Sequence, residues 1–339
     1  MIARLLLVSL LPLLQDSTTE GAAPAGTAQA TEAKAPAAPF VFDRGEDQPP
    51  LLLPREETLV YRARVEFGIL DASVGTVTQT STVEADRPSV LLLQVPKDED
   101  GDGPKAERAT VRLHAKGDYQ LYSMDSVIES HLHPQEWPRV SYSQRSQGTE
   151  KRRREIRMGL QEGKYSASYR KDTSKNAPKG TRIWGEQKFR EIPEGTLDML
   201  TAVFMTRRLI TEEEESLTFP VIDKLKLWEV TLRRGKEKRM RTAAGVFDVV
   251  EVLLEPGPFP GETIDPKKKE RFKGLFGIHG TIHLFVEKNT GIPVRIQGDL
   301  PAGPFTLGID VELGSYSGTP EAFGPVGPPS TRGKVKSGR

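Results

Sequence analysis

A local basic cluster is the first stretch of the sequence whose side chains could bind a ligand. Residues 151–154 read Lys-Arg-Arg-Arg, and Arg157 follows three positions later. Runs of this kind can hold phosphate groups, so Arg152, Arg153 and Arg154 are candidates for an anion-binding site. The alternative interpretation is a solvated strand edge, where charges prevent edge-to-edge pairing. Both interpretations place the cluster at the surface of the protein.

Two patterns of metal-binding residue types are incomplete. His131 and His133 would share one face of a strand about 7 Å apart, and Glu129 is the same-face residue that could serve as a third ligand. Residues 98–103 alternate Asp with other residues around two glycines, as calcium loops do, but Ala109 stands where the twelfth-position Glu belongs. We therefore expect a solvated acidic loop and no bound metal.

No recognisable catalytic motif is present. The Gly-x-Ser-x-Gly pattern is absent, because residues 314–318 have Tyr316 at the nucleophile position. Neither His-Glu-x-x-His nor a phosphate loop occurs, and the lack of cysteine excludes thiolate nucleophiles and disulfides. We expect a protein that is not an enzyme and uses no cofactor. A Ser-His-Asp site assembled from distant residues would not be visible in sequence.

The elements that must position any site are strands, and the clearest of them lie near the C-terminus. Apolar and polar residues alternate through residues 278–286, resume after the turn residues 288–291, and alternate again through residues 305–313 after a loop at 299–304. A period of two puts one set of side chains on each face, which predicts an antiparallel meander with one apolar face. That face must be covered by a second sheet, a helix or a bound apolar molecule. Other strands are expected at 59–67, 74–78, 90–95, 109–113, 119–121, 165–169, 217–221, 225–232 and 246–254, with a turn at 116–118.

Residues 196–209 predict one helix. Leu197, Leu200 and Val203 recur at intervals of three, forming one apolar stripe, and Thr196 is the candidate N-cap. A lone helix among strands is expected to lie over the sheet as a lid. If an apolar ligand occupies the groove of the sheet, the residues expected to line it are Phe67, Phe204, Trp228, Ile282, Leu284, Phe305 and Leu307.

The two ends of the chain differ from its middle in composition. Residues 1–15 predict an export signal, because a basic residue precedes an apolar run that is too short to span a bilayer as a helix. Residues 16–53 predict a disordered Ala/Pro/Thr-rich linker, and residues 318–339 a disordered basic Gly/Pro tail. One folded domain is expected at 54–317. The net charge of the chain is only +1, so nucleic acid is not an expected partner.

Several short pieces of the sequence are informative in their order and spacing: residues 57–61 with Gly75, 130–134, 197–204 with Arg207, 244–247, 280–282 and 291–294. Together they resemble the domain-of-unknown-function 3108 family of exported bacterial proteins. The resemblance implies a periplasmic protein, mainly β, with a strongly curved antiparallel sheet or half-barrel around one packed helix, similar to lipoprotein carriers. It implies no activity. The basic run 151–154 and the longer insert 256–273 depart from the family pattern, which leaves the shape of those two edges open.

These patterns support three functional hypotheses. The first is an exported periplasmic or envelope protein, not an enzyme, that binds an apolar or lipid-like ligand or a partner segment in the groove of its curved sheet. The alternative is a structural or interaction domain with a filled core that binds an envelope partner through its surface. A hydrolase with a site not visible in sequence ranks last. Contact with a membrane is compatible with each hypothesis, whereas spanning a membrane is not expected.

Overall fold

The computed structural model describes most of the predicted domain. The predicted export signal, the linker, the acidic loop 98–103, the strand at 90–95 and all but the first two residues of the 318–339 tail lie outside the described residues, so those predictions stay untested. None of the described helices is long and apolar enough to cross a membrane. The described residues are 56–67, 70–88, 105–119, 122–132, 140–148, 153–174, 177–263, 272, 274, 278–288, 291–302 and 305–319.

Fourteen strands in the described part of the chain form one antiparallel sheet in the order β8-β7-β6-β5-β4-β3-β2-β1-β14-β13-β12-β11-β10-β9. The described helices are the 3₁₀ turn η2 (Lys179–Thr181) and the α-helix α2 (Met199–Thr211). The strands are β1 Glu56–Phe67, β2 Leu70–Pro88, β3 Lys105–Tyr119, β4 Tyr122–Leu132, β5 Val140–Gly148, β6 Arg153–Gln161, β7 Lys164–Lys171, β8 Lys188–Glu191, β9 Ser216–Asp223, β10 Lys226–Thr242, β11 Gly245–Pro258, β12 His279–Glu287, β13 Pro293–Ala302 and β14 Phe305–Thr319.

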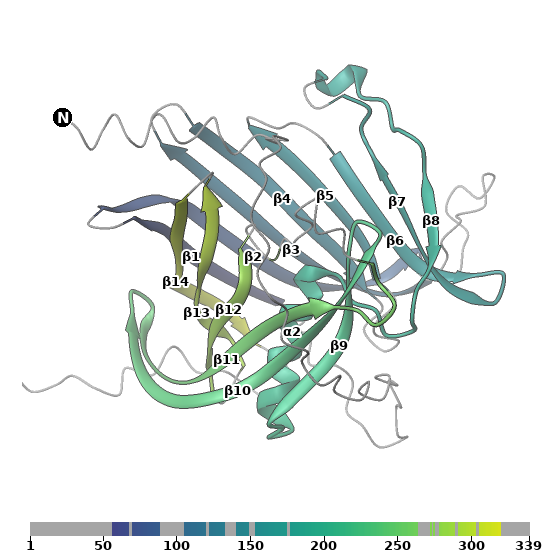
Figure 1. Ribbon diagram of the computed structural model, residues 1–339. Helices are drawn as coiled ribbons and strands as arrows, with labels where there is room; N and C mark the ends of the chain where they lie inside the picture. The colour runs from purple at the N-terminus through teal and green to yellow at the C-terminus, as the bar shows by residue number, and fades with distance from the viewer. Residues whose placement is uncertain are drawn as a thin grey trace, which may run out of the picture.

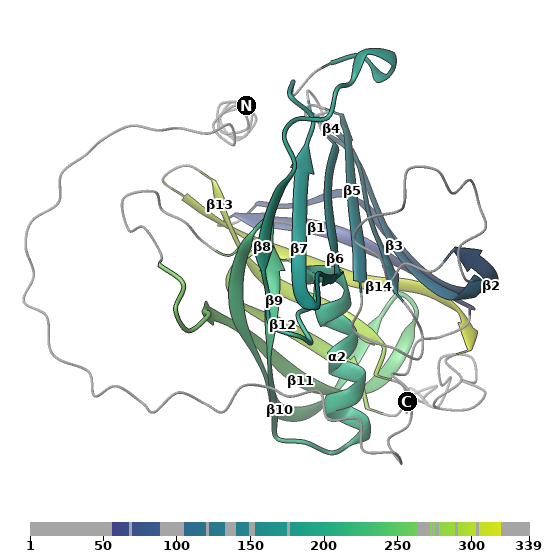
Figure 2. The same cartoon turned by 90° about the vertical axis from the view of Figure 1, so that its right-hand side faces the viewer.

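The sheet curls so strongly that its two arms face each other across α2 (Figures 1 and 2). One arm is β1 to β8 and the other is β9 to β14, and the two edge strands, β8 and β9, are consecutive in the chain. The sheet is not closed between them. Leu197 instead makes one parallel bridge to Val221, with its N–H donating to Pro220 O at 2.9 Å and its carbonyl accepting from Ile222 at 2.9 Å. The predicted mainly β fold with a strongly curved sheet and one packed helix is confirmed.

The predicted C-terminal meander is confirmed as β12, β13 and β14 in one sheet. The predicted loop at 299–304 is mostly strand, because pairing continues from Asp299 with Gly308 to Ala302 with Phe305. Polar Asp299 and the small residues around it suggested a loop, but backbone pairing does not require apolar side chains.

The predicted turn at residues 116–118 is wrong, because these residues lie inside β3. A Cβ atom at Gly117 would stand 2.2 Å from the backbone oxygen of Val74, and one at Gly75 would stand 2.1 Å from the backbone oxygen of Lys116. The glycines are therefore needed for a close approach of β2 and β3, and not for a turn.

Helix α2 begins three residues later than predicted, and it is not a lid. Asp198 is the N-cap: its side chain accepts from the Thr201 N–H at 2.8 Å, and the Thr201 hydroxyl completes a capping box. The predicted cap, Thr196, donates its hydroxyl to Pro193 O instead. Every residue from 200 to 207 is buried, so the helix is enclosed on all sides and forms the centre of the core.

Candidate functional site

A row of buried side chains, three of them polar, crosses the concave face of the sheet beneath α2. In the strand register, Glu57 of β1 pairs with Ser81 of β2, Ser81 pairs with Val111 of β3, and Val111 pairs with Ser130 of β4. Directly paired residues share a face, so all four point to the same side of the sheet. All four are buried. Three strand spacings separate the ends of the row by roughly 14 Å.

Helix α2 carries one charged residue toward each end of this row. Arg207 lies nine residues after Asp198, which is roughly 14 Å along a helix and matches the length of the row. At one end the Arg207 guanidinium donates to both carboxylate oxygens of Glu57, at 2.6 and 2.8 Å. At the other end Asp198 lies beside Ser130. Burial raises the pKa of Asp198, while the Thr201 amide and the Ser130 hydroxyl act in the opposite direction.

The surroundings of Arg207 are close-packed. Gly291 has φ +68°, and a Cβ atom there would lie 2.7 Å from Arg207 Cγ. Tyr61 donates its hydroxyl to Pro293 O at 2.9 Å, and burial raises the pKa of this phenol. We name Glu57, Tyr61, Arg207 and Gly291 the Arg207 cluster. Because its charges are paired and lie out of solvent, it can fix the helix on the sheet but offers no accessible nucleophile.

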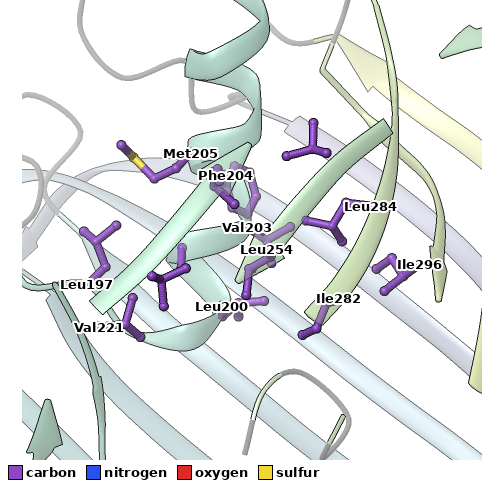
Figure 3. Packing of buried hydrophobic residues seen from close by; sticks show 14 of the residues in the cluster. Leu197, Leu200, Val203, Phe204, Met205, Val221, Leu254, Ile282, Leu284 and Ile296 are labelled. Atoms are coloured by element: carbon purple, nitrogen blue, oxygen red, sulfur yellow. The ribbon is translucent and has the colours of Figure 1, made fainter. Parts of the chain in front are cut away.

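Four of the seven predicted groove residues come together, but as parts of the core. Phe204, Trp228, Ile282 and Leu284 are at most 6% exposed and belong to one continuous apolar cluster. Figure 3 shows Phe204, Ile282 and Leu284 in this cluster. Leu307 is half-buried. For Phe67 and Phe305 the side chains lie outside the described parts of the structure, so their predicted role stays untested.

The predicted insert at residues 256–273 is anchored at both ends. β11 continues to Pro258, and near the other end Phe272 is buried against Trp228, with ring centroids 5.4 Å apart and an edge-on arrangement. Trp228 is therefore covered by a side chain of the protein itself.

The described part of the basic cluster at 151–154 takes part in internal contacts. Arg153 donates to the buried Asp172 at 2.8 Å, and its guanidinium lies 4.3 Å from the centre of the Trp184 ring. Arg154 is half-buried on the same strand, and Arg152 lies outside the described residues. The anion-binding prediction stays a prediction, but charge reversal at Arg153 would disturb folding as well as any ligand.

Three residues on the outer face of β3 and β4 combine a hydroxyl, an imidazole and a carboxylate. His131 Nδ1 lies 3.1 Å from Thr110 Oγ1, and its Nε2 lies 2.9 Å from Glu129 Oε1. The hydrogen bond from His131 lowers the pKa of Glu129. The triple lies on an open sheet surface, where neighbouring backbone N–H groups are engaged in strand pairing and cannot stabilise an oxyanion. His133 lies outside the described residues, and within them no group of three or more His, Asp or Glu could hold a metal.

A longer run of cations lies on β10, in a segment to which the sequence patterns assigned no site. Between Arg233 and Arg241 the chain has six Lys or Arg residues and one acidic residue, Glu237. The run of Lys and Arg is visible in the sequence, but the prediction for this strand rested only on the apolar alternation at residues 225–232. We name these six residues the β10 cations: Arg233, Arg234, Lys236, Lys238, Arg239 and Arg241.

Comparison with known proteins identifies a family. The family model described as "Protein of unknown function (DUF3108)" matches residues 89–310. Among curated proteins, none matches the chain. A solved structure from Brucella abortus, a β-barrel-like protein of domain of unknown function DUF1849, is similar at 11% identity with a TM-score of 0.48, covering 79% of this chain and 99% of that one. Since the family match spans well over half of the residues, the chain belongs to the DUF3108 family.

Proposed function

We propose that this protein is an exported, non-enzymatic interaction domain of the periplasm or cell envelope, with a filled core and a binding surface on its outside. The observation that carries the proposal is the complete burial of residues 200–207 of α2. Export rests on the predicted signal at residues 1–15 and on the family resemblance.

The burial of α2 distinguishes a core helix from a lid. The helix packs on β3 and β4 of one arm and on β9 and β10 of the other. A lid would keep one polar face in water, whereas α2 has none in this stretch. The space that a carrier would offer to a lipid is occupied by side chains such as Leu200 and Phe204 (Figure 3).

The Arg207 cluster also favours a permanent position for the helix. Lifting α2 from the sheet would separate Arg207 from Glu57, both of which are out of solvent. Separating a buried pair leaves an uncompensated charge on at least one side until water enters. A helix that must open for each ligand would be expected to rest on apolar contacts alone.

Hydrogen exchange and native mass spectrometry together test the proposal. In the full chain, amides of residues 202–207 should exchange only through global unfolding, with the same free energy that urea unfolding measures, because this part of the helix is hydrogen-bonded and buried. Amides of the edge strand β8 are the internal control and should exchange sooner. Native mass spectra of protein purified from an envelope fraction should show no lipid adduct. Early exchange of α2 together with a bound acyl chain would instead support the ligand-carrier hypothesis.

A further inference from the structure

We propose that the β10 cations form a docking surface for a bilayer that carries anionic phosphate headgroups. This inference rests on the proposed function, because it gives the outer surface of the domain a specific partner. Six cations in nine strand residues extend over roughly 27 Å of chain.

The cations are exposed and incompletely neutralised. Five of the six are exposed, and Arg234 is half-buried. Arg233 pairs with Glu255 at 3.3 Å and Arg239 with Asp248 at 3.2 Å. Glu237, the acidic residue within the segment, pairs with both Arg234 and Lys288.

Three of the β10 cations have no carboxylate partner within the described residues. Lys238 lies with its ammonium 3.7 Å from the centre of the Phe285 ring. Lys236 and Arg241 are exposed without an ion pair in this part of the chain. At the Arg234 end, the backbone N–H of Arg234 donates to Glu215 O, and residues 212–215 are four exposed glutamates. The positive charge available to an external anion is therefore that of the far half of β10, although the whole chain carries only +1.

The segment is also a free strand edge on a fixed support. β9 pairs with β10 from Lys226 to Arg233, and the Arg234 N–H donates to Glu215 O at 2.9 Å. Beyond Arg234, one edge of β10 has no strand neighbour in the described structure. At the tip of the hairpin, Ala243 N–H donates to Glu312 Oε1 and Ala244 N–H donates to Leu313 O, which fastens the turn to β14. Side chains of a strand point alternately to the two faces of the sheet. If the free edge of β10 lies along a bilayer surface, cations from both faces can therefore reach that surface.

A simpler explanation for charged residues here is protection of the edge against pairing with another chain. The register irregularity between Arg234 and Glu237 serves that purpose too. Edges are protected with lysine in particular, whereas four of the six β10 cations are arginines. Arginine is the side chain suited to bidentate binding of phosphate. A planar layer of phosphates is the partner that a long row of cations of one sign complements best.

Vesicle sedimentation with charge-reversed variants tests the proposal. The full chain should bind vesicles of phosphatidylcholine with about 30% phosphatidylglycerol at 50 mM salt and should be released at 500 mM salt, because headgroup attraction is screened. Vesicles of phosphatidylcholine alone measure any binding that does not depend on charge. The variant Lys236→Glu with Arg241→Glu should lower the partition coefficient at least about tenfold.

The matched control makes the same charge change away from the β10 cations, on the edge strand β8 and in the turn between β9 and β10. Lys188 of β8 and Lys224 are both exposed, and Lys188→Glu with Lys224→Glu should change the partition coefficient less than about twofold. Equal losses in the two double variants, or no preference of the full chain for anionic vesicles, would overturn the proposal. So would binding to polyglutamate resin in place of vesicles, which assigns the cations to an acidic protein. Exchange protection of α2 should be the same in all chains, so failure of docking is distinguishable from failure of the proposed function.

Discussion

The two ends of helix α2 bury opposite charges and treat them differently. At the C-terminal end, Arg207 has a full counter-charge in Glu57, held at 2.6 and 2.8 Å. At the N-terminal end, Asp198 has backbone and hydroxyl donors around it, and burial raises its pKa. Removing either partner of a buried ion pair leaves an uncompensated charge and costs much stability. A buried carboxyl group whose hydrogen-bond donors are neutral can instead take up a proton. The two ends should therefore respond very differently to substitution.

Removing the cation is expected to have the largest effect. Arg207→Met leaves Glu57 buried without a counter-charge and should lower the free energy of unfolding by about 3–5 kcal/mol. Urea unfolding followed by tryptophan fluorescence measures the change. The double variant Glu57→Leu with Arg207→Met should recover most of the loss, because no unpaired charge remains. A loss below about 1 kcal/mol in the single variant would show that Glu57 reaches water or a proton.

Crowding the same end of the helix should have the second largest effect. Gly291→Ala puts a methyl group 2.7 Å from Arg207 Cγ at a φ of +68°, and we expect a loss of about 2–4 kcal/mol from strain and overpacking. Gly163 is a matched control, since its φ is +77° but nothing lies within 4 Å of the added atom. Gly163→Ala should cost only the backbone part, about 1–2 kcal/mol. Thermal and urea unfolding of both variants distinguish the cost of the positive φ from the cost of the contact with Arg207. Equal losses of unfolding free energy in the two variants would refute the close packing against Arg207.

The smallest effect is expected at the other end, and it should depend on pH. Because the pKa of Asp198 is raised on folding, its contribution to stability is complete below the unfolded value of about 3.9 and is lost as pH rises through the folded value. Asp198→Asn keeps an oxygen for the Thr201 N–H and removes this dependence, so at pH 7 it should equal the natural protein or exceed its stability by up to about 1 kcal/mol.

Unfolding at several pH values between 4 and 7 measures the difference between the Asn variant and the natural protein. Asp198→Ala is the control for capping and should cost about 1 kcal/mol at every pH. If Asp198→Asn were strongly destabilising at pH 7, the carboxylate would have to be ionised and paired, as Arg207 is.

The elements predicted correctly from sequence are those in which one face is apolar. β12 and β14 alternate cleanly, because their inner residues enter the core, and α2 shows its apolar spacing even though its surroundings were not predicted. β5 was missed because its residues, such as Ser141 and Gln144, are polar at nearly every position and no period stands out. β8 was missed because it has only four residues. Strand pairing supplies backbone hydrogen bonds regardless of side chain, so such strands form only in context.

The candidate site was less predictable than the fold. Glu57 and Arg207 lie 150 residues apart, and each is an ordinary charged residue in its own segment. The register of β1 to β4 is needed to see that Glu57 and Ser130 lie at the two ends of one row. Arg207 and Asp198 of the helix lie beside these two ends. The lid interpretation failed for a related reason: a stripe on one face of a helix does not reveal that a second arm of the sheet covers the other face.

The pairing of β1 with β14 has a consequence for the order in which the protein folds. The first and last of the described strands lie side by side in the middle of the sheet, from Glu56 with Thr319 to Glu66 with Gly308. Nearly the entire chain must therefore be synthesised before β1 can pair with β14, and contacts between such distant segments form slowly. Strands β2 to β8 pair with their neighbours in sequence and can form hairpins earlier, so the joining of the two arms is expected to be a late step of folding.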